Sequence, residues 1–178
     1  MPETQLDSIP VPALPGERVI AAWDGTEILL VTQASSERER ALAEQVARRA
    51  MRDTPFDTPA YTAQDPDPAL RAFLAREAGQ AVGLAVLRPR RRWAWWGWDE
   101  FDAERRPATG VAPLPTWAVE LIWTHGAGQH RGLGRRLLTE ASRVVDQPIT
   151  SFAWRRPFTP SGEAFVRRLC PEGFWVPE

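Results

Sequence analysis

The stretch IWTHGAGQHRGLGRRLL, residues 122–138, decides the fold class of this chain. It passes from a strand-like apolar run, through a glycine-rich turn, into a helix. Such a junction leaves the first helical N–H groups without partners, and the helix dipole adds partial positive charge there. Arg131, Arg135 and Arg136 add three cations, and a cation in a first helical turn is easier to explain when a bound anion offsets it. The stretch therefore predicts a phosphate site, with an ordinary tight turn carrying solvated arginines as the alternative.

The residues on either side of this turn have clear periodicities. TWAVELIWT, residues 116–124, alternates as a strand does, and from Gly134 apolar residues recur at helical spacing through Val145. The alternation places four large apolar residues on one strand face: Trp117, Val119, Leu121 and Trp123. Ala118, Glu120, Ile122 and Thr124 are then expected on the other face.

Three earlier segments extend this pattern. RVIAAWD and EILLVT flank an Asp-Gly turn and predict a hairpin over residues 18–32. Ser36 and Glu39 have the spacing of a capping box and predict that a helix follows. Prolines, aspartates and threonines over residues 53–68 predict a surface loop within one domain.

The other segments are more ambiguous. LRAFLARE, residues 70–77, is compatible with a helix or with one strand of a hairpin that continues into AVGLAVLRP. RPRRRWAWWGWDEF, residues 88–101, predicts a strand that leads into a loop. Its arginines and tryptophans could form a nucleic-acid surface, but the acidic residues at its end favour a core strand with a substrate-facing rim. ITSFAW predicts a strand, Thr159-Pro160 a helix start, and GFWVP a last strand.

Length and composition indicate one α/β domain. The 178 residues carry a net charge of −1, which gives no global attraction to nucleic acid or to an anionic membrane. We expect an extended tail over residues 1–16, one domain over residues 17–178, no membrane segment and no nucleic-acid partner. The single Cys170 gives no internal disulfide and no metal site with two histidines, so a cytoplasmic location is expected.

The glycine-rich turn does not match the two best-known phosphate loops. All 22 basic residues are arginine, so the lysine of a P-loop is absent, and the spacing Gly-x-Gly-x-x-Gly is not completed after Gly134. The spacing Gln-x-x-Gly-x-Gly is present at Gln129, Gly132 and Gly134. It resembles the pyrophosphate-binding motif of the GNAT acetyltransferase superfamily, which implies the GNAT fold, a mixed sheet flanked by helices.

Three separated segments are also similar to the ESCO (Eco-type) cohesin acetyltransferases. Ile122-Trp123-Thr124 has the position of the Ile-Trp-Val strand that precedes the coenzyme loop of that family. ERVIAAWDGTEILLV contains a similar Trp-Asp-Gly hairpin, and RPFTPSGEAFVRRLC aligns with the family segment Asp-Pro-Thr-Pro-Asp-Gly and the Phe and Cys that follow. The resemblance covers residues 17–176 and lacks the zinc finger of the eukaryotic members.

The resemblance implies that acetyl-CoA is the co-substrate and that an acetyl group moves to an amine. The pyrophosphate would bind the loop amides and the nearby arginines, and the strand would hold the pantetheine and the thioester. The candidate coenzyme residues are Ile122, Trp123, Thr124, Gln129, His130, Arg131, Gly132, Leu133, Gly134, Arg135 and Arg136.

The catalytic base is a separate question, because an amine with a pKa near ~10.4 must lose a proton before or during attack. The position of the acid in the ESCO-type segment is Pro157 here, which cannot transfer a proton. Glu120 is our first candidate, with a structural ion pair to an arginine as the alternative, and His125 is the second. Tyr61 lies in the proline-rich loop and is not assigned, and Cys170 is expected to be a small core residue.

The acceptor implied by the ESCO similarity is a protein lysine. A small-molecule amine or an N-terminus is an alternative acceptor for the same enzyme. A non-catalytic acyl-CoA sensor and an arginine- and tryptophan-based nucleic-acid binder are alternatives from other classes. A homodimer is also compatible with the sequence.

Overall fold

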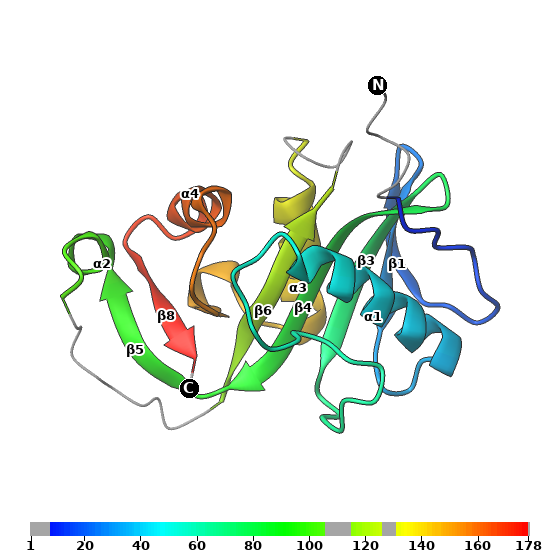
Figure 1. The fold of residues 1–178 in the computed structure, drawn as a ribbon, viewed down its shortest axis with the longest axis horizontal. Helices are drawn as coiled ribbons and strands as arrows, with labels where there is room; N and C mark the ends of the chain where they lie inside the picture. Colours follow the sequence, from blue (N-terminus) through cyan, green and yellow to red (C-terminus); the bar gives the residue numbers. More distant parts are fainter. Residues whose placement is uncertain (1–7, 106–114, 126–130, 178) are drawn as a thin grey trace.

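The computed structural model describes residues 8–105, 115–125 and 131–177. Its centre is one eight-stranded mixed sheet with the strand order β1-β2-β3-β4-β6-β7-β8-β5 (Figure 1). The strands are β1 (Val19–Trp23), β2 (Thr26–Val31), β3 (Arg71–Glu77), β4 (Gln80–Arg90), β5 (Arg92–Gly97), β6 (Thr116–Thr124), β7 (Ala153–Trp154) and β8 (Gly173–Pro177). The first four are antiparallel neighbours, whereas β6, β7 and β8 run parallel. The α/β class and the mixed sheet are therefore confirmed.

Helices lie on both faces of this sheet. The bounds are α1 (Glu37–Met51), α2 (Trp98–Asp102), α3 (Leu133–Val145) and α4 (Pro160–Leu169), with a 3₁₀ turn at Ile149–Ser151. Helix α1 packs on one face, where Val46, Ala47 and Ala50 are buried, and α3 packs on the other (Figure 1). No helix in the described ranges is long and apolar enough to cross a membrane.

The helix caps and the first hairpin form where the sequence predicts them. Ser36 and Glu39 form a reciprocal capping box at the start of α1, and Thr159 caps α4, with Pro160 as its first residue. The Asp-Gly hairpin forms between β1 and β2. LRAFLARE, which the sequence leaves open between helix and strand, is strand β3, because it pairs with β2 and β4 along its whole length.

Residues 8–16, for which the sequence predicts an extended tail, contribute to the core. Ile9 and Val11 are almost completely buried in the cluster beneath α1. The N–H of Val11 donates to the carbonyl of Gly79 at 2.8 Å, and the N–H of Ala81 donates to that of Ile9 at 2.9 Å. Apolar residues between prolines thus bind this segment to the start of β4.

Strand β6 takes part in both cores because a bulge interrupts its alternation. Leu121 pairs with Val86 and Val119 pairs with Leu87, so Glu120 is an additional residue between them. Before the bulge, Trp117 and Val119 face the cluster that contains α3. After it, Leu121 and Trp123 face the cluster beneath α1. The prediction that these four residues share one face is therefore wrong, since one extra residue reverses the alternation.

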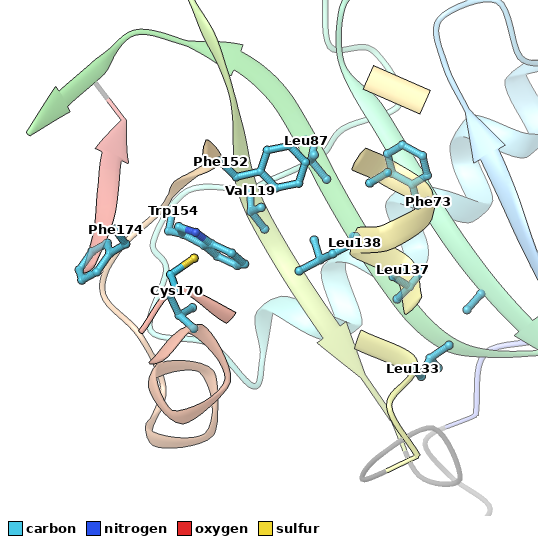
Figure 2. Packing of buried hydrophobic residues seen from close by; sticks show 14 of the residues in the cluster. Phe73, Leu87, Val119, Leu133, Leu137, Leu138, Phe152, Trp154, Cys170 and Phe174 are labelled. Atoms are coloured by element: carbon cyan, nitrogen blue, oxygen red, sulfur yellow. The ribbon is translucent and has the colours of Figure 1, made fainter. Parts of the chain in front are cut away.

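The core beneath α3 fixes this helix against the sheet. Figure 2 shows Leu133, Leu137 and Leu138 of α3 directed toward the strands, and all three are buried. Cys170 lies beside Trp154 in the same cluster and is 4% exposed, which confirms that it is a core residue. Burial also raises the pKa of its thiol.

Candidate active site

An opening between β6 and β7 provides the central feature of the site. The two strands pair only at Ala118 and Val119 within the described chain, and the N–H of Arg155 then donates to the carbonyl of Val119 at 3.1 Å. Beyond this point a pocket lies between the strands, with about 430 Å³ of empty space when the adjoining open solvent is included. Its lining comprises Thr54, Pro55, Phe56, Val119, Glu120, Leu121, Ile122, Trp154, Arg155, Pro157, Phe158, Thr159, Gly162 and Val166. We call this pocket the slot.

Peptide groups of β6 border the slot. The N–H of His125 donates to the carbonyl of Val82 on β4 at 2.9 Å. Successive peptide groups of a strand point to opposite edges, so the N–H of Ile122 points away from β4 and toward the slot edge. A long, flexible ligand with amide groups could therefore pair with β6 as a further strand would.

Glu120 lies at the bulge of β6, in the lining of the slot. Its side chain is 5% exposed, and Oε1 accepts a hydrogen bond from Nε of Arg90 at 2.8 Å. Removing a carboxylate from water is costly unless a cation compensates for it, and the guanidinium does so here. The structural ion pair that the sequence left as an alternative is present, and it holds a nearly buried carboxylate at the edge of the slot.

A second, polar hollow meets the slot at Glu120 and Arg155, which line both. It has a volume of about 950 Å³ and is open to solvent. Its lining comprises Thr58, Pro59, Asp65, Arg88, Arg90, Glu120, Arg155, Arg156, Val176 and Pro177. We call this hollow the basin. Glu120 therefore lies where two differently shaped spaces meet.

The N-terminus of α3 has the properties that the sequence predicts for an anion site. Gly132 precedes the helix with φ = 75° in the left-handed region, where a Cβ would be strained. No side chain caps the helix and no acidic residue lies in its first turn. The N–H of Arg136 is the one that donates to the carbonyl of Gly132, so the N–H groups of Leu133, Gly134 and Arg135 have no partner within the helix.

The three arginines that are predicted to bind the coenzyme make different contacts. Arg131 forms an ion pair with Glu77 at the end of β3, at 2.8 Å. The guanidinium of Arg136 lies 3.9 Å from the ring centre of Trp23 on the first hairpin. Arg135 is exposed and has no ion pair among the described residues. Of the three, Arg135 is thus the cation that needs no rearrangement to meet an anion.

The other predicted residues of this region lie near the end of β6. The indole N–H of Trp123 donates to Asp53 Oδ2 at 3.0 Å, and its ring stacks on His125 at a centroid distance of 5.4 Å. The Trp123 hydrogen bond and the Arg49 guanidinium lower the pKa of Asp53 despite its burial. Neither pocket lining includes His125.

Some predicted residues cannot be placed, and others were missed. Gln129 and His130 lie outside the described residues. The sequence analysis did not identify Arg155 and Arg156 or the loop residues 54–59. The two arginines follow directly after the predicted strand ITSFAW. A charged pair at the end of a strand that adjoins the coenzyme strand would have indicated them as site residues.

Comparison with known proteins gives the family. The acetyltransferase (GNAT) family profile matches residues 34–154, which is more than half of the chain. No curated protein matches. The acetyltransferase domain of xEco2, solved with a K105-CoA conjugate, superimposes with a TM-score of 0.68 at 19% identity, over 91% of this chain and 97% of that one.

Two further structures share the fold. A second structure of the xEco2 acetyltransferase domain gives a TM-score of 0.66 at 18% identity and covers 93% of this chain and 98% of that one. Ribosomal-protein-alanine N-acetyltransferase from Brucella melitensis biovar Abortus 2308 gives 0.50 at 16% identity, over 86% and 96%. The chain belongs to the GNAT acetyltransferase family and is an N-acetyltransferase that uses acetyl-CoA as its co-substrate.

Proposed function

We propose that this enzyme acetylates the side-chain amine of a protein lysine, with acetyl-CoA held across the end of β6 and Glu120 as the base. The pyrophosphate meets the N–H groups at the start of α3 and the guanidinium of Arg135. The pantetheine arm enters the slot and pairs with the main-chain groups of Ile122 and Thr124, on either side of Trp123. The lysine reaches the thioester from the basin.

The reaction balances with one proton transfer and one acyl transfer. A neutral amine nitrogen attacks the thioester carbonyl carbon, a C–N bond forms, and the C–S bond breaks as CoA thiolate leaves. As the C–N bond forms, the nitrogen loses one proton to Glu120 or to a water molecule bound to it. The thiolate, with a pKa around ~8.5, takes up a proton or leaves as the anion. The N–H that points from β6 toward the slot donates to the carbonyl oxygen as negative charge develops on it.

The position of Glu120 is the observation that carries this proposal. Glu120 and Arg155 line both the slot and the basin, and of these two only Glu120 has a side chain that can accept a proton. Its side chain is 5% exposed. The hydrogen bond from Arg90 Nε, at 2.8 Å, fixes the position of the carboxylate at this junction. His125, the second candidate base, stacks on Trp123 and lines neither the slot nor the basin, so it is a weaker candidate for the base than Glu120.

The replacement Glu120→Gln tests this role. It retains the shape and the hydrogen-bonding ability of the side chain and removes the charge. We expect kcat to fall by about 10²–10⁴-fold, the usual contribution of a positioned acid or base, with the acidic limb of the pH–rate profile lost. Glu140→Gln is the matched control, because Glu140 is a similarly buried glutamate paired with an arginine, on α3. Equal losses in both variants, or an unchanged pH profile in Glu120→Gln, would exclude Glu120 as the base.

The assay can use the absence of lysine from the enzyme itself. All 22 basic residues are arginine, so any acetyl-lysine formed belongs to the acceptor. Thermal unfolding with and without acetyl-CoA reports binding, because a ligand at 100 times its Kd stabilises the folded state by about 2.7 kcal/mol. Stabilisation without release of CoA thiol, with either lysine-bearing proteins or small amines, would indicate an acyl-CoA sensor instead.

A further inference from the structure

The charges of the basin exceed what its own residues neutralise. Its lining contains four guanidinium groups and two carboxylates, although the whole chain carries a net charge of only −1. Arg88 pairs with Asp65 at 2.6 Å, and Arg90 pairs with Glu120 at 2.8 Å. Arg155 and Arg156 are the two cations that remain.

Neither of these two arginines has a carboxylate partner within the described ranges. Arg155 donates from its terminal nitrogen to the carbonyl and the hydroxyl of Thr58, at 3.0 and 2.6 Å. Its guanidinium lies 4.1 Å from the ring centre of Phe56, and that of Arg156 lies 4.5 Å from the ring centre of Trp96. Both guanidinium groups are thus held against aromatic rings, and neither forms an ion pair with a carboxylate of the described residues.

Partial burial makes this arrangement unfavourable without an anion. Removal from water lowers the pKa of Arg155 and of Arg156, although both stay charged at neutral pH. A guanidinium held by stacking presents its remaining donors in a fixed plane, which suits a carboxylate or another planar oxyanion. Glu120 attracts Arg155 electrostatically, but its carboxylate is hydrogen-bonded to Arg90, so the donors of Arg155 and Arg156 that face the basin have no carboxylate acceptor among the described residues.

We infer that the acceptor lysine belongs to an acidic polypeptide segment, whose neighbouring carboxylates bind Arg155 and Arg156 while the lysine amine approaches Glu120. This rests on the proposed function, in which the basin is the acceptor side. A segment with one lysine and neighbouring acidic residues matches the charges of the site. The lysine ammonium group is attracted by the Glu120 carboxylate, and the acidic residues are attracted by Arg155 and Arg156. The open 950 Å³ hollow also admits an extended chain.

The test uses three lysine peptides of equal length, in which the residues beside the lysine are Asp and Glu, Ser and Asn, or Arg. We expect kcat/KM for the acidic peptide to exceed that for the neutral peptide by at least tenfold, mainly through KM. This ratio should fall with added salt, because the interacting charges are partly exposed. Arg156 is exposed, so Arg156→Gln removes its charge and its contact with Trp96 at the surface, and this variant should reduce the ratio toward one. Arg155→Gln should do the same.

Arg48→Gln is the matched control, since it removes one arginine charge from an exposed position of α1 that belongs to neither lining. It should leave the ratio unchanged. An unchanged ratio in Arg156→Gln and Arg155→Gln, or a preference of the native enzyme for the neutral or basic peptide, would overturn the inference. Faster acetylation of free amino acids than of the acidic peptide would overturn the assignment to a polypeptide.

A binding measurement separates this inference from the proposed function. Fluorescence anisotropy of the same labelled peptides, with the enzyme saturated with CoA, reports affinity without any chemistry. If no peptide is acetylated, the proposed lysine acetylation fails, whereas a retained preference for acidic peptides in binding still supports the basin assignment. If peptides are acetylated but bind without preference, the proposed function stands and the inference fails.

Discussion

The contact between Gly83 on β4 and the first turns of α3 gives the sharpest test of how this helix is positioned. A Cβ at Gly83 would lie 3.0 Å from Leu137 Cδ1, 3.1 Å from Leu133 Cδ2 and 3.3 Å from the carbonyl oxygen of Trp123. The two leucine methyl groups can yield slightly, but the β6 carbonyl cannot. Gly83→Ala should therefore cost about 1–3 kcal/mol of unfolding free energy by overpacking.

A double-mutant cycle isolates the contact. Leu137 is fully buried, so Leu137→Ala alone should cost about 2–5 kcal/mol. The added methyl group of Gly83→Ala partly fills the space that Leu137→Ala creates. The double variant should therefore lose about 0.5–3 kcal/mol less than the sum of the two single losses.

Urea unfolding followed by tryptophan fluorescence measures these differences, because the chain has nine tryptophans. With a slope of about 1–3 kcal/mol per molar urea, a loss of ~2 kcal/mol moves the midpoint by roughly 1 M. Losses that add within ~0.3–0.5 kcal/mol would show that Gly83 and Leu137 are not in contact. Weaker acetyl-CoA binding by Gly83→Ala is also expected, since the substitution displaces the helix to which the proposed binding mode assigns the pyrophosphate.

Three further outcomes concern stability. Ser36→Ala should cost about 1 kcal/mol in urea unfolding, because it removes the capping box with Glu39. Tyr61 is the single tyrosine, and burial raises its pKa to about 12. Phenolate absorbance should therefore stay low at pH 11, and the free energy of unfolding should fall as the pH rises from about 10 to about 12. A phenol that ionises near 10 would contradict its burial. The Arg76 hydrogen bond lowers the pKa of Glu17, so Glu17→Gln should cost about 1–3 kcal/mol at neutral pH, and this difference should disappear as the pH falls below the usual pKa of a glutamate. A difference that persists in acid would refute the ion pair.

Local signals predicted most of the fold. The Asp-Gly hairpin, the capping box at Ser36 and the cap at Thr159 are each written in a few adjacent residues, and all are present. The choice for LRAFLARE could not be made in this way. Its propensity suits a helix, and the pairing with β2 and β4 that makes it a strand comes from residues distant in the sequence.

The site was predictable in outline, but its acceptor side was not. Gly132 and the uncapped start of α3 follow from the glycine-rich turn alone. The bulge at Glu120 does not, because an alternating sequence gives no sign of one extra residue between Val119 and Leu121. The basin is assembled from β4, β6, β8, the loop after α1 and the residues that follow β7, so no single stretch of sequence reveals it.

The brevity of β7 has a consequence for how the molecule unfolds. Among the described residues, β6 and β7 pair at two positions, with one further hydrogen bond from Arg155 to Val119, and β7 leads on to β8 and β5. We call this short junction between β6 and β7 the seam. It weakens the cooperativity of unfolding, because few hydrogen bonds must break before β7, β8 and β5 separate from the rest of the sheet. Coenzyme lying in the seam would bridge both sides, so amide exchange in β8 should slow on binding although no ligand touches that strand.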